Sequence, residues 1–230
     1  MQDISAAQTK RALWTLLLDY FHDNGIAMVS YHAVKRDGTP FAIAADGFPE
    51  EWLCQYIEKD LVTIDPIPEL AAKMSTPFFW HDIEALVDIT PERRKYLDAM
   101  KDAHLGDGLA FFVFGPAMQN AYVGLGFGVD RIELEQAEII KLQCIAQAGH
   151  LRVCALTEKH PSFQALTGRE REILEWVAQG KSNSVIADIV GISSHTVDAH
   201  MRNIYRKLRV NDRTSAAVRG IGSGIVQYPG

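Results

Sequence analysis

The stretch that decides the fold spans residues 166–216 and reads LTGREREILEWVAQGKSNSVIADIVGISSHTVDAHMRNIYRKLRVNDRTSA. Thr167 and Glu170 have the spacing of a capping box, in which each side chain satisfies a free backbone N–H at the start of a helix. Ser182 and Ser193 are favourable N-cap residues for two further helices, and Gly191 suits the turn between them. Two short helices joined by a glycine-containing turn are typical of a helix-turn-helix unit.

The third of these helices, expected over residues 194–208, has two unlike faces. Its apolar side chains recur at three- and four-residue steps and predict a core-facing stripe. Polar side chains on the opposite face offer donors and an acceptor suited to base edges in the major groove. Taken alone, that face also fits an ordinary solvated surface. The residues predicted to contact DNA are Lys181, Ser193, His195, Thr196, Asp198, Ala199, Arg202, Arg206 and Lys207.

Charge is unevenly distributed along the chain, whose formal net charge is −6. Residues 163–230 hold nine Lys and Arg against six Asp and Glu, a net +3, whereas residues 1–162 hold 14 against 23, a net −9. An acidic body with a basic terminal part is expected when only one part meets phosphate. Charge alone leaves DNA binding undecided.

The whole string resembles the LuxR-type, also called GerE-type, DNA-binding domain. The resemblance rests on Leu166-Thr167-x-Arg169-Glu170, Ala178-x-Gly180-Lys181-Ser182-Asn183, Ile186-Ala187, Thr196-Val197-x-x-His200 and Lys207-Leu208-x-Val210. It implies a helix in the major groove, with Asp198, Ala199 and Arg202 nearest the bases. We expect Arg202 to contribute sequence specificity and Lys207 to contact phosphate.

Upstream, the patterns predict an α+β domain. Residues 7–24 read as a helix, residues 26–34, 41–45, 108–114 and 121–129 as strands, and residues 50–59, 68–74, 91–104 and 133–156 as helices, with a turn at residues 35–38. We expect an α-β-α sandwich over residues 1–156, with an antiparallel sheet enclosing a ligand pocket. A linker over residues 157–164 and an all-α four-helix helix-turn-helix domain over residues 165–230 would follow.

The sequence of the first domain should show which signal controls the DNA-binding domain. A phosphoacceptor receiver domain is disfavoured, because the first strand is followed by Lys35 and Arg36 instead of an acidic pair, and because strands and helices do not alternate regularly. The segment Trp52-x-x-x-Tyr56-x8-Asp65-Pro66, followed by Trp80 and Gly108, resembles the ligand-binding domain of acyl-homoserine-lactone receptors. By that resemblance Asp65 accepts from the amide N–H of the ligand, Trp52 donates to the lactone carbonyl, and Tyr56 donates to the acyl carbonyl.

Departures from the receptor pattern predict the acyl chain. Phe48 stands where several members have Tyr, Gly126 and Gly128 stand where several have Ser or Thr, and Ile67 replaces a hydroxyl residue. We expect a widened pocket with few partners for a 3-oxo group, and hence an unsubstituted or bulky acyl chain. The residues predicted to bind ligand are Phe48, Trp52, Tyr56, Asp65, Pro66, Trp80, Phe111 and Gly128, with Phe79 also around the tail.

The remaining features limit the alternatives. Cys54, Cys144 and Cys154 form no CxxC pair and are expected to be buried as small hydrophobes. No apolar run near the start is long enough for a signal or membrane segment, so we expect a cytoplasmic protein without a membrane partner. No nucleophile motif favours an enzyme, and no cofactor or metal is expected. Expected partners are double-stranded DNA, an autoinducer, a second copy in a homodimer and, for an activator, RNA polymerase. A regulator that senses another amphipathic molecule, or acts without ligand, remains the alternative.

Overall fold

The computed structural model describes residues 2–34, 40–116, 119–128, 133–157 and 165–226. The main division between its two compact units falls after Thr157. The predicted turn at residues 35–38 and residues 158–164 of the predicted linker lie outside the described residues. The first unit contains α1 (Gln2–Ala6), α2 (Lys10–Asp23), β1 (Met28–Val34), β2 (Pro40–Asp46), α3 (Glu50–Glu58), the 3₁₀ turn η1 (Leu61–Thr63), α4 (Pro66–Lys73), β3 (Phe78–Phe79), the 3₁₀ turn η2 (Trp80–Asp82), α5 (Ile83–Leu86), α6 (Pro91–Asp102), β4 (Asp107–Val113), β5 (Ala121–Gly128) and α7 (Gln136–Thr157).

The strands form one antiparallel sheet in the order β2-β1-β5-β4-β3. The predicted antiparallel sheet is therefore confirmed. Strand β3 was not expected, because its two residues are too few to show a side-chain alternation. It pairs Phe78 with Ala110 and Phe79 with Leu109 at the edge of the sheet.

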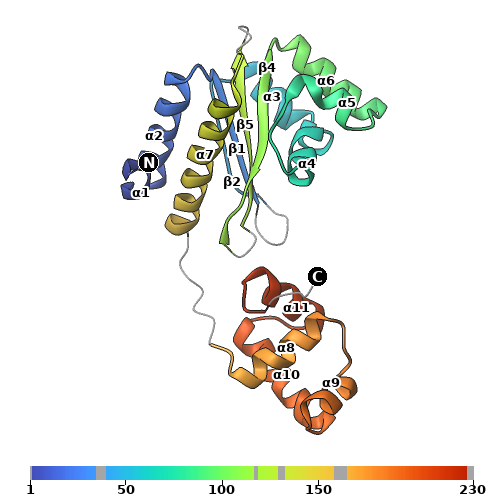
Figure 1. Cartoon of the computed structure of the whole chain (residues 1–230). Coiled ribbons are helices and arrows are strands. Elements are labelled where there is room, and N and C mark those ends of the chain that lie inside the picture. Colours follow the sequence, from blue (N-terminus) through green and yellow to red (C-terminus); the bar gives the residue numbers. More distant parts are fainter. Residues whose placement is uncertain (1, 35–39, 117–118, 129–132, 158–164, 227–230) are drawn as a thin grey trace. The chain divides into compact units, whose positions relative to one another are not determined.

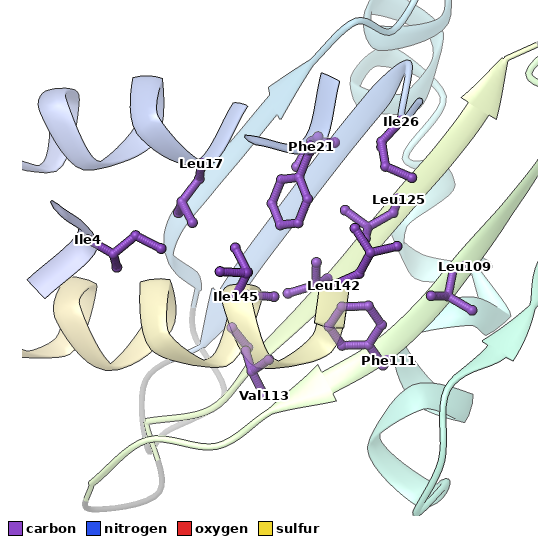
Figure 2. Close-up of a cluster of buried hydrophobic side chains, with 14 of the residues drawn as sticks. Ile4, Leu17, Phe21, Ile26, Leu109, Phe111, Val113, Leu125, Leu142 and Ile145 are labelled. Carbon is purple, nitrogen blue, oxygen red and sulfur yellow. The ribbon is translucent and has the colours of Figure 1, made fainter. Parts of the chain in front are cut away.

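Helices α1, α2 and α7 cover one face of the sheet (Figure 1). Alternate side chains of β4 and β5 point into the core beneath them, as the period of two residues in a strand requires. Figure 2 shows this core, in which Phe21 of α2 and Leu142 of α7 meet the aromatic and aliphatic side chains of the sheet. Its members on β4 and β5 are Leu109, Phe111, Val113, Ala121, Val123, Leu125 and Phe127.

Helices α3 to α6 lie on the opposite face (Figure 1), where a second core gathers. The sheet is therefore covered on both sides, which confirms the α-β-α sandwich. Strand β5 is buried at every position from Ala121 to Phe127, and this explains why its sequence is almost continuously apolar. The second core includes Met28, Trp52, Ile67, Leu70, Phe78, Trp80, Ile83, Tyr96, Leu97, Met100, Leu105, Ala110 and Tyr122.

Two local expectations differ from the structure. Helix α4 begins at Pro66 and not at residue 68, because the Asp65 side chain accepts from Ile67 N and caps the helix. Proline is tolerated at this first helical position, where its missing N–H would have no partner. Of the three cysteines only Cys154 is buried, because Cys54 and Cys144 fall on the outward faces of α3 and α7.

The second unit is all helical, as expected, and consists of α8 (Gly168–Ala178), α9 (Asn183–Val190), α10 (Ser194–Leu208) and α11 (Arg213–Gly222). Thr167 and Glu170 form the predicted capping box, and Ser182 and Ser193 cap α9 and α10. Gly191 ends α9 with a φ of 68°, the left-handed conformation that glycine adopts readily. The shared core is built around Ile173, Leu174, Val177, Ile186, Val197, Met201, Ile204, Leu208 and Ala216.

Candidate functional site

A cavity of about 50 Å³ lies between the sheet and the helices of its second face. It brings together five of the predicted ligand-binding residues, which come from the segment before α3, from α3 itself, from the loop before α4 and from η2. Trp52 and Tyr56 both reach it because they are one helical turn apart on α3. The cavity is lined by Ser30, His32, Ala45, Phe48, Trp52, Leu53, Tyr56, Asp65, Ile67, Trp80, Tyr96, Met100, Leu105 and Tyr122.

The Asp65 carboxylate is the central polar group of the cavity. Its Oδ1 accepts from Ile67 N at 2.8 Å, and its Oδ2 accepts from the Tyr56 hydroxyl at 2.9 Å. The Tyr96 hydroxyl also bonds to it. Burial raises the pKa of Asp65 to about 6, although these three hydrogen bonds favour the ionised form. The result is a buried carboxylate that accepts three hydrogen bonds within the protein, about one fewer than its two oxygens can accept.

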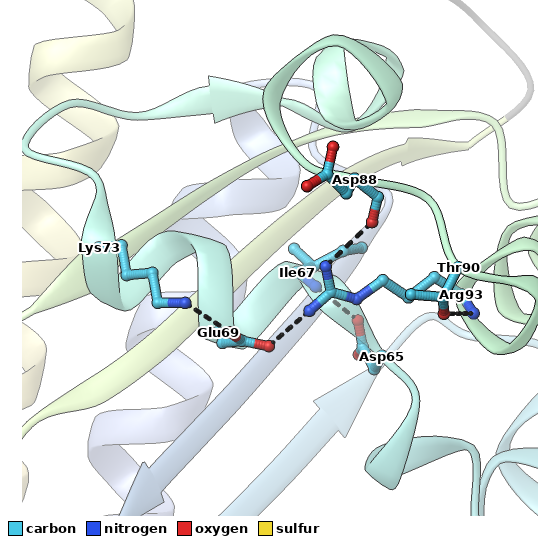
Figure 3. A network of polar contacts seen from close by, with 7 residues as sticks. All are labelled: Asp65, Ile67, Glu69, Lys73, Asp88, Thr90 and Arg93. Atoms are coloured by element: carbon cyan, nitrogen blue, oxygen red, sulfur yellow. Dashed lines mark hydrogen bonds and ion pairs between the residues drawn. The ribbon is translucent and has the colours of Figure 1, made fainter.

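A polar network lies close to Asp65, on α4 and at the start of α6 (Figure 3). Arg93 of α6 donates to Glu69 of α4 at 2.8 Å and to the backbone oxygen of Asp88 at 3.1 Å. Lys73 donates to the same Glu69 side chain at 2.5 Å. These exposed bonds each contribute little to stability, and of them the Arg93–Glu69 pair is the one that joins α6 to α4. Asp65 caps α4 and Tyr96 lies on α6, so both partners are held by the same pair of helices.

Four polar lining residues were not predicted from the sequence. Ser30 and His32 lie on β1, Tyr96 on α6, and Tyr122 on β5 directly opposite His32 in the strand register. Burial raises the pKa of Tyr96 and Tyr122 and lowers that of His32, so the cavity favours the neutral forms. The only sequence signal was the alternation that places residues 28, 30 and 32 on one face. These groups supply hydrogen-bonding partners that the departures at Phe48 and Ile67 were expected to remove.

Four predicted residues do not line the cavity. Phe111 points to the opposite face of the sheet and packs in the core under α2 and α7, as does Phe79 in part. Pro66 is buried at the start of α4, and Gly128 lies at the end of β5 with a φ of 75°, beside Gly106. The expectation that Phe111 and Gly128 enclose the ligand is therefore corrected, because a period of two residues directs residue 111 away from the cavity.

The glycines of the sheet make room for Trp80 and do not widen the pocket. A Cβ on Gly108 would lie 2.7 Å from Cδ2 and Cε2 of Trp80, and a Cβ on Gly126 would lie 2.9 Å from its Cη2. Such distances are far below van der Waals contact. The indole therefore fills the space that the two glycines leave.

On the second unit, α10 presents the polar face predicted from the sequence. Its side chains at 195, 196, 202 and 206 are exposed, and those at 198 and 199 are half-buried. Asp198 accepts from Asn183 Nδ2 of α9, and Asn183 Oδ1 in turn accepts from Arg213 at 2.7 Å. This network gives Asp198 a structural role, because it joins α10 to α9. Lys181 and Ser193 are exposed at helix ends.

Lys207 has a structural position that the sequence did not reveal. Its Nζ donates to Glu170 Oε2 at 2.6 Å and to the backbone oxygen of Ala165 at 3.2 Å. The two paired side chains are only 14% and 4% exposed. The expectation that Lys207 contacts phosphate is therefore corrected, since its charge is directed into the domain by the capping-box glutamate.

A helix-turn-helix unit with an exposed polar reading face, carried on the same chain as a small cavity around a buried carboxylate, defines a ligand-responsive transcription regulator. The described residues contain no group of three or more His, Cys, Asp or Glu placed to hold a metal ion. In the same ranges, none of the helices has the length and apolarity needed to cross a bilayer.

Comparison with known proteins agrees with this class. The family described as the autoinducer binding domain matches residues 9–153, and the family of bacterial regulatory proteins of the LuxR type, GerE, matches residues 164–219. The chain therefore belongs to the LuxR family of autoinducer-binding transcription regulators. These families are regulators and not enzymes.

Several curated proteins are similar over most of this chain. The HTH-type regulator y4qH of Sinorhizobium fredii is 31% identical over 182 residues, which are 78% of this chain but 56% of that protein. The HTH-type quorum sensing-dependent transcriptional regulator RpaR of Rhodopseudomonas palustris is 27% identical, covering 84% of this chain and 79% of its own. The transcriptional activator protein AnoR of Acinetobacter nosocomialis is 28% identical, and the match covers 81% of this chain and 79% of that protein.

Solved structures show the same fold. SdiA of Escherichia coli superposes with a TM-score of 0.71 at 21% identity, covering 96% of this chain and 94% of that one. SdiA in complex with octanoyl-rac-glycerol gives the same TM-score at 20% identity, with 98% and 93% covered. At this level of identity the likeness concerns the fold alone.

Proposed function

We propose that the cavity of the first unit binds an N-acyl-homoserine lactone and that the liganded protein regulates transcription in quorum sensing. Residues 1–156 form the autoinducer-binding domain, residues 157–164 the linker and residues 165–230 the DNA-binding domain. The chain acts in the cytoplasm, where its DNA lies. The ligand-binding residues are Phe48, Trp52, Tyr56, Asp65 and Trp80, together with Ser30, His32, Tyr96 and Tyr122.

The observation that carries this proposal is the geometry of Asp65. Its carboxylate faces a mostly apolar cavity, beside the indole of Trp52, whose ring centroid lies 5.9 Å from that of Tyr56. A buried carboxylate without a full set of partners is costly, and an amide N–H is the kind of donor that completes the set. An acyl lactone offers that donor, two carbonyl acceptors and an apolar chain.

The reading face of α10 supports sequence-specific DNA binding. Arg202 and Arg206 are exposed one helical turn apart, and an arginine can bond bidentately to guanine in the major groove. His195, Thr196 and Ala199 lie nearer the start of the helix, while Ser193 and Lys181 are placed for phosphate. Asp198 contributes by holding α9 and α10 together, and Lys207 by stabilising the domain.

We further propose that the regulator binds a two-fold promoter site as a homodimer, as helix-turn-helix proteins commonly do. Ile140 and Leu151 of α7 are 50% and 47% exposed, and Leu16 of α2 is 36% exposed. Removing such apolar side chains from water favours association. If the protein is an activator, RNA polymerase is its further partner.

A second candidate keeps the fold and changes the ligand. SdiA, which has the same fold, is known in complex with octanoyl-rac-glycerol. The polar side chains Ser30, His32 and Tyr122 on the sheet wall suit the hydroxyl groups of such an amphiphile. The same wall supplies partners for a substituted acyl chain, so the expectation of an unsubstituted chain no longer has support from the cavity.

The deciding experiment is mass spectrometry of small molecules extracted from protein that was expressed with a mixture of acyl-homoserine lactones and octanoylglycerol. We expect one stoichiometric lactone, which is lost from Asp65→Ala and kept by Glu51→Ala, an exposed acid on α3. Octanoylglycerol in its place would favour the second candidate. A folded protein that carries neither and still binds DNA would remove the lactone proposal.

A further inference from the structure

Asp198 is the acidic residue of α10, and it lies on the polar side of the helix. His195 precedes it by three residues and Arg202 follows it by four, so the three side chains share one face, opposite the buried stripe of α10. The first turns of a recognition helix are the part that meets base edges in the major groove. Asp198, the fifth residue of α10, therefore stands among the base-facing positions.

Only one of the two carboxylate oxygens of Asp198 is used within the domain. Its Oδ1 accepts from Asn183 Nδ2, and no described residue donates to its Oδ2. Arg202 is one helical turn away, but it forms no hydrogen bond or ion pair with Asp198 or with any other described residue. The reading face therefore carries a free acceptor beside a free donor.

Asn183 holds this carboxylate in a defined orientation. Arg213 donates to Asn183 Oδ1 at 2.7 Å and also to the backbone oxygen of Lys181. Because a guanidinium group only donates hydrogen bonds, the oxygen of Asn183 faces Arg213 and its NH₂ group faces Asp198. The Asp198 side chain is thus fixed from the protein side, while its second oxygen stays available to DNA.

The chemistry of a carboxylate limits which base it can meet. In the major groove cytosine presents its N4 amino donor, whereas guanine and thymine present acceptors. An ionised carboxylate can only accept, so guanine and thymine at the same place repel it. Adenine has an amino donor, but its N7 acceptor lies beside that donor on the same edge. Cytosine is therefore the base that suits this oxygen best.

We propose that Oδ2 of Asp198 accepts a hydrogen bond from the N4 amino group of a cytosine in each half-site, which makes Asp198 a specificity-determining residue. The inference rests on the proposed DNA-binding function of α10. A rise of about 1.5 Å per residue separates Asp198 and Arg202 by about 6 Å along the helix, which is about two base-pair steps. We expect the cytosine within that distance of the guanine that Arg202 contacts.

The first test selects bound duplexes from a random library, with the full-length protein prepared in the presence of the acyl-homoserine lactone mixture. We expect one position in each half-site to favour cytosine over guanine or thymine by about tenfold, equal to about 1.4 kcal/mol. Asp198→Asn should lose that preference and keep the rest of the site, because an amide whose oxygen stays on Asn183 presents a donor to the base. Asp188→Asn, the same change at an exposed acid of α9, should keep it. A variant Asp198→Asn that selects the same bases with uniformly lower affinity would overturn the proposal.

The second test needs no variant of Asp198. In the selected duplex the cytosine is replaced by N4-methylcytosine, which keeps the base pair and places a methyl group where the amino donor faced the major groove. Binding by the unaltered protein should weaken by about tenfold, and unchanged binding would show that Asp198 does not contact this group. If the unaltered protein enriches no sequence at all, the DNA-binding function itself fails, and this inference fails with it.

Discussion

Replacing Lys207 by Met should unfold the DNA-binding unit far more than it alters DNA contacts. The substitution leaves Glu170, which is 4% exposed, without its cationic partner. Removing one partner of a buried ion pair costs about 3 to 5 kcal/mol. We take the lower end, about 3 kcal/mol, because Glu170 still accepts from Thr167 N at 2.7 Å. For a unit of this size that loss lowers the unfolding midpoint by about 12 to 24 °C.

The assay is calorimetric and urea unfolding of the full chain, with Arg206→Met as the matched control. Arg206 is the neighbouring exposed cation on α10, and its loss should shift the midpoint by only a few degrees. The double variant Glu170→Gln with Lys207→Met should recover part of the loss, because it leaves no unpaired charge. If Lys207→Met unfolded at the same temperature as the unaltered protein while it lost affinity for all DNA sequences alike, Lys207 would be a phosphate contact and this account would be wrong.

The stability that the Glu170–Lys207 pair contributes should fall as the pH falls. Burial opposes ionisation of Glu170, but the bonds from Lys207 and Thr167 outweigh it and hold the pKa of Glu170 below its ordinary value. Stability from this pair is therefore present above the pKa of an unfolded glutamate and is lost as the pH falls through the lowered folded value. The difference between Lys207→Met and the unaltered protein should shrink in acid.

Three further outcomes test the cavity and the reading face. Burial raises the pKa of Asp65 to about 6, so the unliganded sensor should gain stability as the pH falls from about 7 to about 4; Asp65→Asn should remove that gain in pH-dependent unfolding, and a gain that persists would place its source elsewhere. Gly108→Ala puts a methyl group 2.7 Å from the Trp80 ring and should weaken lactone binding about tenfold or more in calorimetry, whereas Gly168→Ala, with open space around it, should not. Arg202→Ala should lower the ratio of specific to random DNA affinity by about tenfold or more in band-shift titrations; an equal loss on both DNAs would make it a phosphate contact.

Much of the fold could be predicted from local patterns. Capping signals such as Thr167 with Glu170 and Ser193 before α10 act within one turn of a helix, so they are readable from the sequence alone. Strand β3 could not be predicted from the sequence, because its two residues take their conformation from pairing with β4, which is distant in sequence.

In the candidate site, too, some residues could be predicted from local spacing and others could not. Trp52, Tyr56 and Asp65 belong to one short segment whose spacing carries the resemblance, and the structure brings their side chains together. Tyr96 and Tyr122 reach the cavity only through tertiary packing and strand register, which no local pattern encodes. The error at Lys207 has the same origin, because its partner Glu170 is 37 residues away.

Strand β5 has a consequence for how this regulator can change over evolution. Its odd-numbered side chains build the core under α2 and α7, and its even-numbered positions face the cavity side. Substitutions at 122, 124 or 126 can therefore alter which molecule is recognised while the packing behind the sheet stays intact. Substitutions at 123 or 125, in contrast, lower the stability of the domain, because these side chains are part of that core. Within one eight-residue strand, the positions that can change ligand recognition are thus separate from the positions that maintain the stability of the domain.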